Sequence, residues 1–86
     1  MYFYCEAKPG QGQPGVGDWT GTSAGTFAGA KQAATRAAML VTTTLWIATG
    51  PALRGNPRPI AFNRYDEAKG KRGGWQEAPR DPDSAT

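Results

Sequence analysis

A single stretch of the chain, residues 22–41, carries the period of an α-helix, and it lies between segments with the composition of β-strands. At about 100° per residue its apolar positions fall on one arc: Phe27, Ala30, Ala34, Ala37, Ala38 and Val41. A face made mostly of alanine allows a helix to lie close to a sheet, and Thr22 or Ser23 is expected to cap its amino end. One such helix covers only one face of a sheet.

Three segments have the β-branched and aromatic composition of strands: residues 2–7 (YFYCEA), 41–49 (VTTTLWIAT) and 58–65 (RPIAFNRY). A Gly/Pro-rich stretch at residues 8–21 predicts a long loop, and a second loop joins the last two segments as an antiparallel hairpin. The sequence therefore predicts an α+β fold, a three-stranded and mainly antiparallel sheet with one helix packed on one face, in the order β-α-β-β.

The predicted compact domain covers residues 1–65, and residues 66–86 are expected to form a flexible or loosely docked tail. This tail is rich in Gly, Pro and charge and contains few aliphatic residues. Trp75 is its exception and is expected to be an anchor, which docks on its own domain over the open sheet face or on a partner. Trp19 is expected to pack near the start of the helix.

The alternation of side chains along the predicted strands divides them between two faces. The helix-facing set is expected to be Phe3, Cys5, Ala7, Leu45, Ile47, Ile60 and Phe62. The open face would then carry Tyr2, Tyr4, Trp46 and Tyr65, an aromatic set typical of interaction surfaces and our predicted partner-binding anchors. The alternatives are that these rings pack on the tail or in a self-dimer, or that the register differs by one residue, which exchanges the two faces.

Basic residues form the second candidate constellation. Residues 54–72 hold six Lys or Arg residues against Asp66 and Glu67 only. Arg54, Arg58 and Arg64 are the predicted electrostatic contacts beside the aromatic set. Such a segment fits an acidic protein surface or a phosphate backbone with bases stacked on its rings, and it also fits a solvated edge strand protected by charge.

Most catalytic devices are unsupported, because the chain has no His and one Cys. No zinc set or internal disulfide is available within one chain, and a serine nucleophile lacks its usual base. Glu6 and Asp18 are the only acids before residue 66, and Cys5 is expected to be a small buried apolar residue. We expect no enzymatic activity, no metal and no cofactor.

Location and nucleotide binding follow from two further patterns. The longest apolar stretch, residues 37–48, is short and broken by threonines, and a lone Cys fits a reducing compartment, so we expect a cytoplasmic protein with no membrane partner. Gly10, Gly12 and Gly15 match a dinucleotide-binding fingerprint, but Thr22 lies seven residues beyond the last glycine, too far for the pyrophosphate to meet the helix. We therefore assign no nucleotide to them.

At the level of architecture, the chain resembles small phage-encoded inhibitor proteins of the anti-CRISPR kind. The matching features are the aromatic opening strand, the helix TSAGTFAGAKQAATRAAM, the hairpin TTTLWIATG to PRPIAFNRY and the lack of a catalytic set, over about residues 2 to 65. The resemblance implies a protein, in the host cytoplasm, that binds a nuclease or its RNA-guided complex and blocks it sterically. It transfers no functional residue.

The sequence thus predicts a non-enzymatic binding protein that occupies a protein or ribonucleoprotein surface with acidic character. Direct nucleic-acid binding through the same face is the first alternative. A small structural or assembly protein, for instance a homodimer formed through a sheet edge, is the second.

Overall fold

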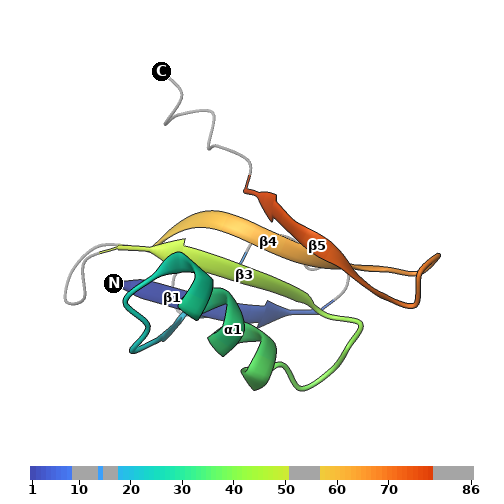
Figure 1. The fold of residues 1–86 in the computed structure, drawn as a ribbon, viewed down its shortest axis with the longest axis horizontal. Helices are drawn as coiled ribbons and strands as arrows, with labels where there is room; N and C mark the ends of the chain where they lie inside the picture. Colours follow the sequence, from blue (N-terminus) through green and yellow to red (C-terminus); the bar gives the residue numbers. More distant parts are fainter. Residues whose placement is uncertain (9–13, 15–17, 51–56, 79–86) are drawn as a thin grey trace.

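The computed structural model of the protein describes residues 1–8, 14, 18–50 and 57–78. Within them the chain forms an antiparallel sheet with strand order β2-β1-β3-β4-β5 and one helix, α1, on one side of it (Figure 1). The elements are β1 (Tyr2–Ala7), β2 (Thr20–Gly21), α1 (Phe27–Ala37), β3 (Thr44–Thr49), β4 (Arg58–Asp66) and β5 (Lys71–Glu77). The predicted α+β class is confirmed, but the described sheet has five strands rather than three.

The larger of the two additional strands, β5, lies in the segment predicted to be a loose tail. A tight turn returns the chain alongside β4: the Asp66 carbonyl accepts from the Gly70 N–H at 2.9 Å, and the Asp66 side chain accepts from the Ala68 N–H at 3.0 Å. Gly70 has a φ of +68°, in the left-handed region that glycine adopts at no steric cost. The turn at residues 66–70 therefore brings the following segment alongside β4 as a strand, although the composition of that segment resembles a flexible tail.

The other additional strand, β2, consists of the last two residues of the predicted 8–21 loop and pairs with β1. Most of that loop, including Gly10, Gly12 and Gly15, lies outside the described residues.

Helix α1 is shorter at both ends than its apolar period predicts. Its N-cap is Thr26, whose hydroxyl accepts from the Gly29 N–H at 3.0 Å, so the prediction of Thr22 or Ser23 is wrong. The helix stops after Ala37 because Ala38 turns to extended geometry, with a ψ of 127°. Ala30 and Ala34 are buried against the sheet, as predicted, whereas Val41 is 56% exposed and lies outside the helix.

Replacing Thr26 with alanine removes this cap and is expected to lower the free energy of unfolding by about 1 kcal/mol. Ser23→Ala is the matched control, because Ser23 is exposed and lies outside the helix. Urea titrations followed by circular dichroism compare the two variants. A larger loss for Ser23→Ala than for Thr26→Ala would contradict the assignment.

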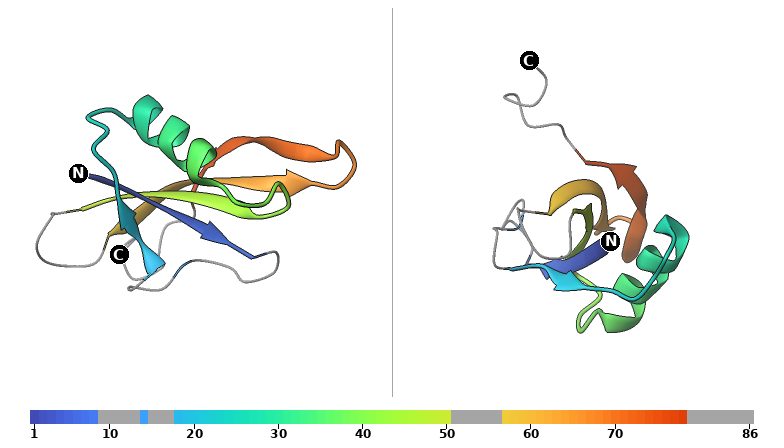
Figure 2. Two further views of the ribbon diagram at one scale, coloured as in Figure 1. Left: turned by 90° about the horizontal axis from the view of Figure 1, so that it is seen from below. Right: turned by 90° about the vertical axis from the view of Figure 1, so that its left-hand side faces the viewer.

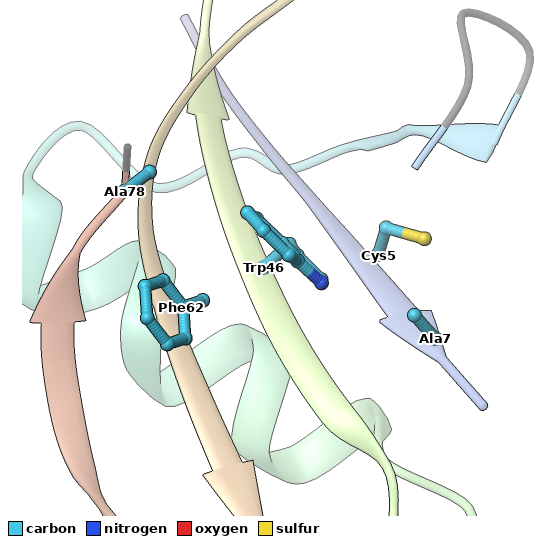
Figure 3. Packing of buried hydrophobic residues seen from close by; sticks show 5 residues of the cluster. All are labelled: Cys5, Ala7, Trp46, Phe62 and Ala78. Carbon is cyan, nitrogen blue, oxygen red and sulfur yellow. The ribbon is translucent and has the colours of Figure 1, made fainter. Parts of the chain in front are cut away.

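Buried side chains lie on both faces of the sheet. The helix-side cluster consists of Ala30, Ala34, Leu45, Ile47 and Ala61, with Tyr2, Tyr4, Ile60 and Trp75 packed against it. The opposite cluster consists of Cys5, Ala7, Trp46, Phe62 and Ala78, with Trp19 packed against it (Figure 3). Leu45 and Ile47 face the helix as predicted, and Ile60, at an irregularity in the β3–β4 register, packs against the helix-side cluster.

The predicted helix-facing positions of β1 and of Phe62 are wrong. Cys5 and Phe62 are both Cα partners of Trp46, and side chains opposite each other in antiparallel strands share a face. Cys5, Ala7 and Phe62 therefore lie with Trp46, and Phe3 shares their side by the period of two. Alternation within one strand shows which residues share a face, but not which of the two faces meets the helix. The pairing of β1 with β3 decides this, and it places Cys5 and Ala7 on the side away from the helix.

Candidate functional site

The four predicted aromatic anchors do not share one open face. Tyr2 and Tyr4 pack on the helix-side cluster, and the Tyr2 ring stacks on Phe27 with centroids 6.3 Å apart. Trp46 is on the other side and only 4% exposed, within the opposite cluster. Tyr65 is partly buried on β4. The predicted aromatic face is therefore wrong, because the sheet buries both of its sides.

The predicted basic contacts are partly described. Arg58 and Arg64 are exposed on β4, and the Arg64 guanidinium lies 4.8 Å from the centroid of the Phe62 ring, over the opposite cluster. Arg54 lies outside the described residues. These positions do not show whether the arginines contact a partner, so their electrostatic role stays a prediction.

The connection between α1 and β3 presents three consecutive large apolar side chains to solvent. Met39 is 84% exposed, Leu40 62% and Val41 56%. We refer to these three residues as the apolar loop. Sequence reasoning missed it because AMLV continues the helical period, so its residues were assigned to the end of the helix and Val41 to its buried arc.

The backbone of the apolar loop is held by the Glu6 carboxylate of β1. This carboxylate accepts from the Met39 N–H at 2.9 and 3.0 Å, from the Leu40 N–H at 3.0 Å and from the Thr43 hydroxyl at 2.6 Å. These two amides follow the end of α1, where the chain has left the helix. The Glu6 carboxylate thus accepts hydrogen bonds from backbone N–H groups that would otherwise donate to water.

Arg72 of β5 holds the carbonyl groups of the same loop. Its Nη2 donates to the Leu40 carbonyl at 2.6 Å and to the Thr43 hydroxyl oxygen at 2.9 Å, and its Nε donates to the Thr43 carbonyl at 3.0 Å. Thr43 lies between the two charges and is only 3% exposed. Glu6, Thr43 and Arg72 therefore join β1, the loop and β5, and we call them the loop clamp.

The clamp shifts the titration of Glu6. Partial burial acts to raise the pKa of Glu6, but hydrogen bonds from Thr43, Met39 and Leu40 and the charge of Arg72 outweigh it and hold that pKa below its usual range. The carboxylate is therefore charged at neutral pH and bound by donors on one side. This arrangement suits a structural anion better than a proton-transfer group.

Cys5 is buried, as predicted. Burial raises the pKa of the Cys5 thiol, and the negative charges of Asp18 and Glu6 raise it further. A thiol in this state is mostly protonated at neutral pH and is a weak nucleophile.

Two features of the described residues concern a membrane and a metal ion. No helix among them has both the length and the apolar character needed to cross a membrane. In the same residues, no three His, Cys, Asp or Glu side chains gather to form a metal site.

The chain was also compared with known proteins. No protein-family model, curated protein or solved structure matches it significantly.

Proposed function

We propose that the protein is a non-enzymatic binding protein that docks the apolar loop into a pocket on a macromolecular partner. The carrying observation is that Met39, Leu40 and Val41 are exposed together on a backbone fixed by the loop clamp. Single exposed apolar residues are ordinary, whereas a contiguous group is typical of an interaction site. Because the loop is already ordered, binding costs less conformational entropy than it would for a free segment.

The proposed acidic character of the partner rests on Arg36, the basic residue nearest to the apolar loop in the sequence. Arg36 occupies the last turn of α1, and the β4–β5 hairpin at the same end of the sheet carries Lys69 and Lys71, which Asp66 and Glu67 balance in number (Figures 1 and 2). Basic groups around an apolar centre are a common arrangement in protein interfaces, where the centre supplies affinity and the rim steers association.

The more specific proposal is that the partner is a nucleic-acid-targeting nuclease or RNA-guided complex, which the protein inhibits by steric occlusion. Its support is the architectural resemblance to phage-encoded inhibitors of the anti-CRISPR kind. Cleavage assays on a panel of purified RNA-guided complexes test it directly. Unchanged cleavage across the panel at micromolar protein would count against this specific form and leave the binding role open.

The binding role is tested at the loop itself. A photo-reactive leucine analogue at position 40 crosslinks the neighbour in host-cell lysate, and the identified protein is then purified and titrated. Met39→Ser combined with Leu40→Ser is expected to weaken that complex by about 10- to 100-fold, since apolar hot spots cost over 1 kcal/mol each.

The control for this titration is Ala68→Ser, an exposed change in the neighbouring β4–β5 turn, which is expected to retain affinity and stability. An affinity that survives the double substitution would refute the docking role of the loop. A log-linear fall of affinity with salt on oligonucleotides would instead favour direct nucleic-acid binding.

A further inference from the structure

A second surface lies on the other flank of the helix, where an open groove of about 410 Å³ separates α1 from Trp75 of β5. Its helical wall is a single stripe, because the residues recur every three or four positions: Ala28, Lys31, Gln32, Thr35 and Arg36. None of the residues of the apolar loop lines it.

The strand beside this groove is the edge of the sheet. In the described part of the chain β5 pairs with β4 and with no other strand. The Ala78 N–H donates to the Ile60 carbonyl at 3.0 Å, which makes Ile60 and Ala78 a hydrogen-bonded pair. Hydrogen-bonded and non-bonded pairs alternate in antiparallel strands, so Trp75 and Glu77, opposite Asn63 and Ala61, direct their backbone N–H and C=O groups away from β4.

Trp75 connects the edge with the groove. Its side chain packs against the helix-side cluster and forms the sheet-side wall of the groove, while its backbone lies on the free edge. Both views of Figure 2 show β5 on the side of the sheet where α1 lies. A strand added to β5 at this point would therefore run along the groove, with alternate side chains directed towards α1.

The groove wall determines which side chains such a strand needs. Lys31 and Arg36 supply positive charge, and Gln32 and Thr35 supply polar groups. The Lys31 ammonium lies 4.6 Å from the centroid of the Phe27 ring, one turn earlier in the helix. Glu77 is the one acidic residue of β5 and lies at its carboxyl end.

We propose that the groove between α1 and β5 binds an extended acidic segment of a partner protein, which adds as a strand to the free edge of β5 and places carboxylates against Lys31 and Arg36. The groove shares Arg36 with the surroundings of the apolar loop but none of the loop's own residues. The peptide assay below does not involve the partner of the loop, so failure of one proposal leaves the other standing.

The test uses the wild-type protein and a fluorescein-labelled decapeptide of alternating Glu and Val, followed by fluorescence anisotropy. Saturable binding is expected, and Lys31→Gln combined with Arg36→Gln is expected to weaken it by about 10-fold, as two exposed charge pairs would. The same peptide with Lys in place of Glu is expected not to bind. Equal binding of the Lys peptide would overturn the proposal.

Backbone methylation tests strand addition without any change to the protein. In an added strand the N–H groups of alternate residues point to β5. Two further peptides are therefore compared, one N-methylated at every Glu and the other at every Val. One of the two peptides is expected to lose binding, and the other is expected to keep it. Equal behaviour of the two peptides would exclude strand pairing.

Two competing occupants of the groove each have their own measurement. Binding of an oligothymidylate of eight nucleotides in preference to the acidic peptide would overturn the proposal. It would instead favour single-stranded nucleic acid stacked on Trp75. A concentration-dependent dimer in sedimentation velocity that excludes the peptide would overturn it in favour of a second copy of this chain.

Discussion

Trp46→Ala is expected to lower the free energy of unfolding by about 3–5 kcal/mol, the usual cost of removing a large buried aromatic side chain. Trp46 is 4% exposed and lies 5.3 Å from Phe62, between ring centroids, in the cluster opposite the helix (Figure 3). Its removal leaves a cavity between β1 and β4. Because a small domain has only about 5–15 kcal/mol of stability, much of the population is expected to unfold near body temperature.

Trp46→Phe is the informative companion variant. Among the described residues, the Trp46 Nε1–H is buried and has no hydrogen-bond partner, so phenylalanine removes an unsatisfied donor while it keeps most of the ring. The expected cost is about 1 kcal/mol, well below that of alanine. Urea titrations of both variants measure the difference.

This pair of variants also separates a packing role from a contact role for Trp46. A folded Trp46→Phe protein with unchanged partner affinity is the result expected for packing. Equal losses of stability in both variants would mean that the indole nitrogen has a partner, and a stable Trp46→Ala protein would contradict the burial.

Glu6→Ala is expected to cost about 2–3 kcal/mol, because hydrogen bonds to a charged group contribute about 1.5–3 kcal/mol and Thr43 is buried. The substitution leaves the Thr43 hydroxyl and the Met39 and Leu40 amides without their common acceptor and leaves Arg72 without the opposite charge. Glu67→Gln is the matched control, an exposed carboxylate in the β4–β5 turn, and is expected to change stability little.

The clamp also predicts how stability depends on pH. Since the pKa of Glu6 is lower in the folded than in the unfolded state, its contribution is present above the unfolded pKa and is lost as pH falls through the folded value. Melting temperatures between pH 7 and pH 3 are expected to fall less steeply in Glu6→Gln than in the wild type. Parallel curves for the two proteins would refute the role of Glu6 in acid destabilisation.

Loss of the clamp is expected to reach the apolar loop as well. Amide hydrogen exchange at Met39 and Leu40 is expected to accelerate in Glu6→Gln, because their N–H groups lose a charged acceptor. Partner affinity is expected to fall through the cost of ordering the loop, even though the apolar side chains are unchanged.

Local pattern predicted the features that depend on near neighbours. The small-residue face of α1 correctly indicated burial of Ala30 and Ala34, since side chains four residues apart lie on one side of a helix. Segments with strand composition correctly indicated β1, β3 and β4. The β5 strand was missed because Gly73 and Gly74 within it suggest a loop, and Gly74 does have a φ of +120°.

The candidate site could not be predicted from the sequence either, because it depends on contacts between segments that are far apart in the chain. Glu6, Thr43 and Arg72 belong to three separate segments, and Arg72 is 66 residues beyond Glu6 in the chain. Nothing in the spacing of these residues indicates that they meet. The apolar loop becomes a site only because the helix ends at Ala37, and the period of the sequence continues past that residue.

The sequence by itself determined the class of the fold and the presence of α1, β1, β3 and β4, because helical and strand periods depend on residues within a few positions of one another. Only the tertiary structure decided which face each strand of the sheet presents, that both faces are covered, and that Met39, Leu40 and Val41 are exposed on a clamped backbone. These features depend on strand register and on hydrogen bonds between distant segments, and a shift of one residue in register reverses every side chain of a strand.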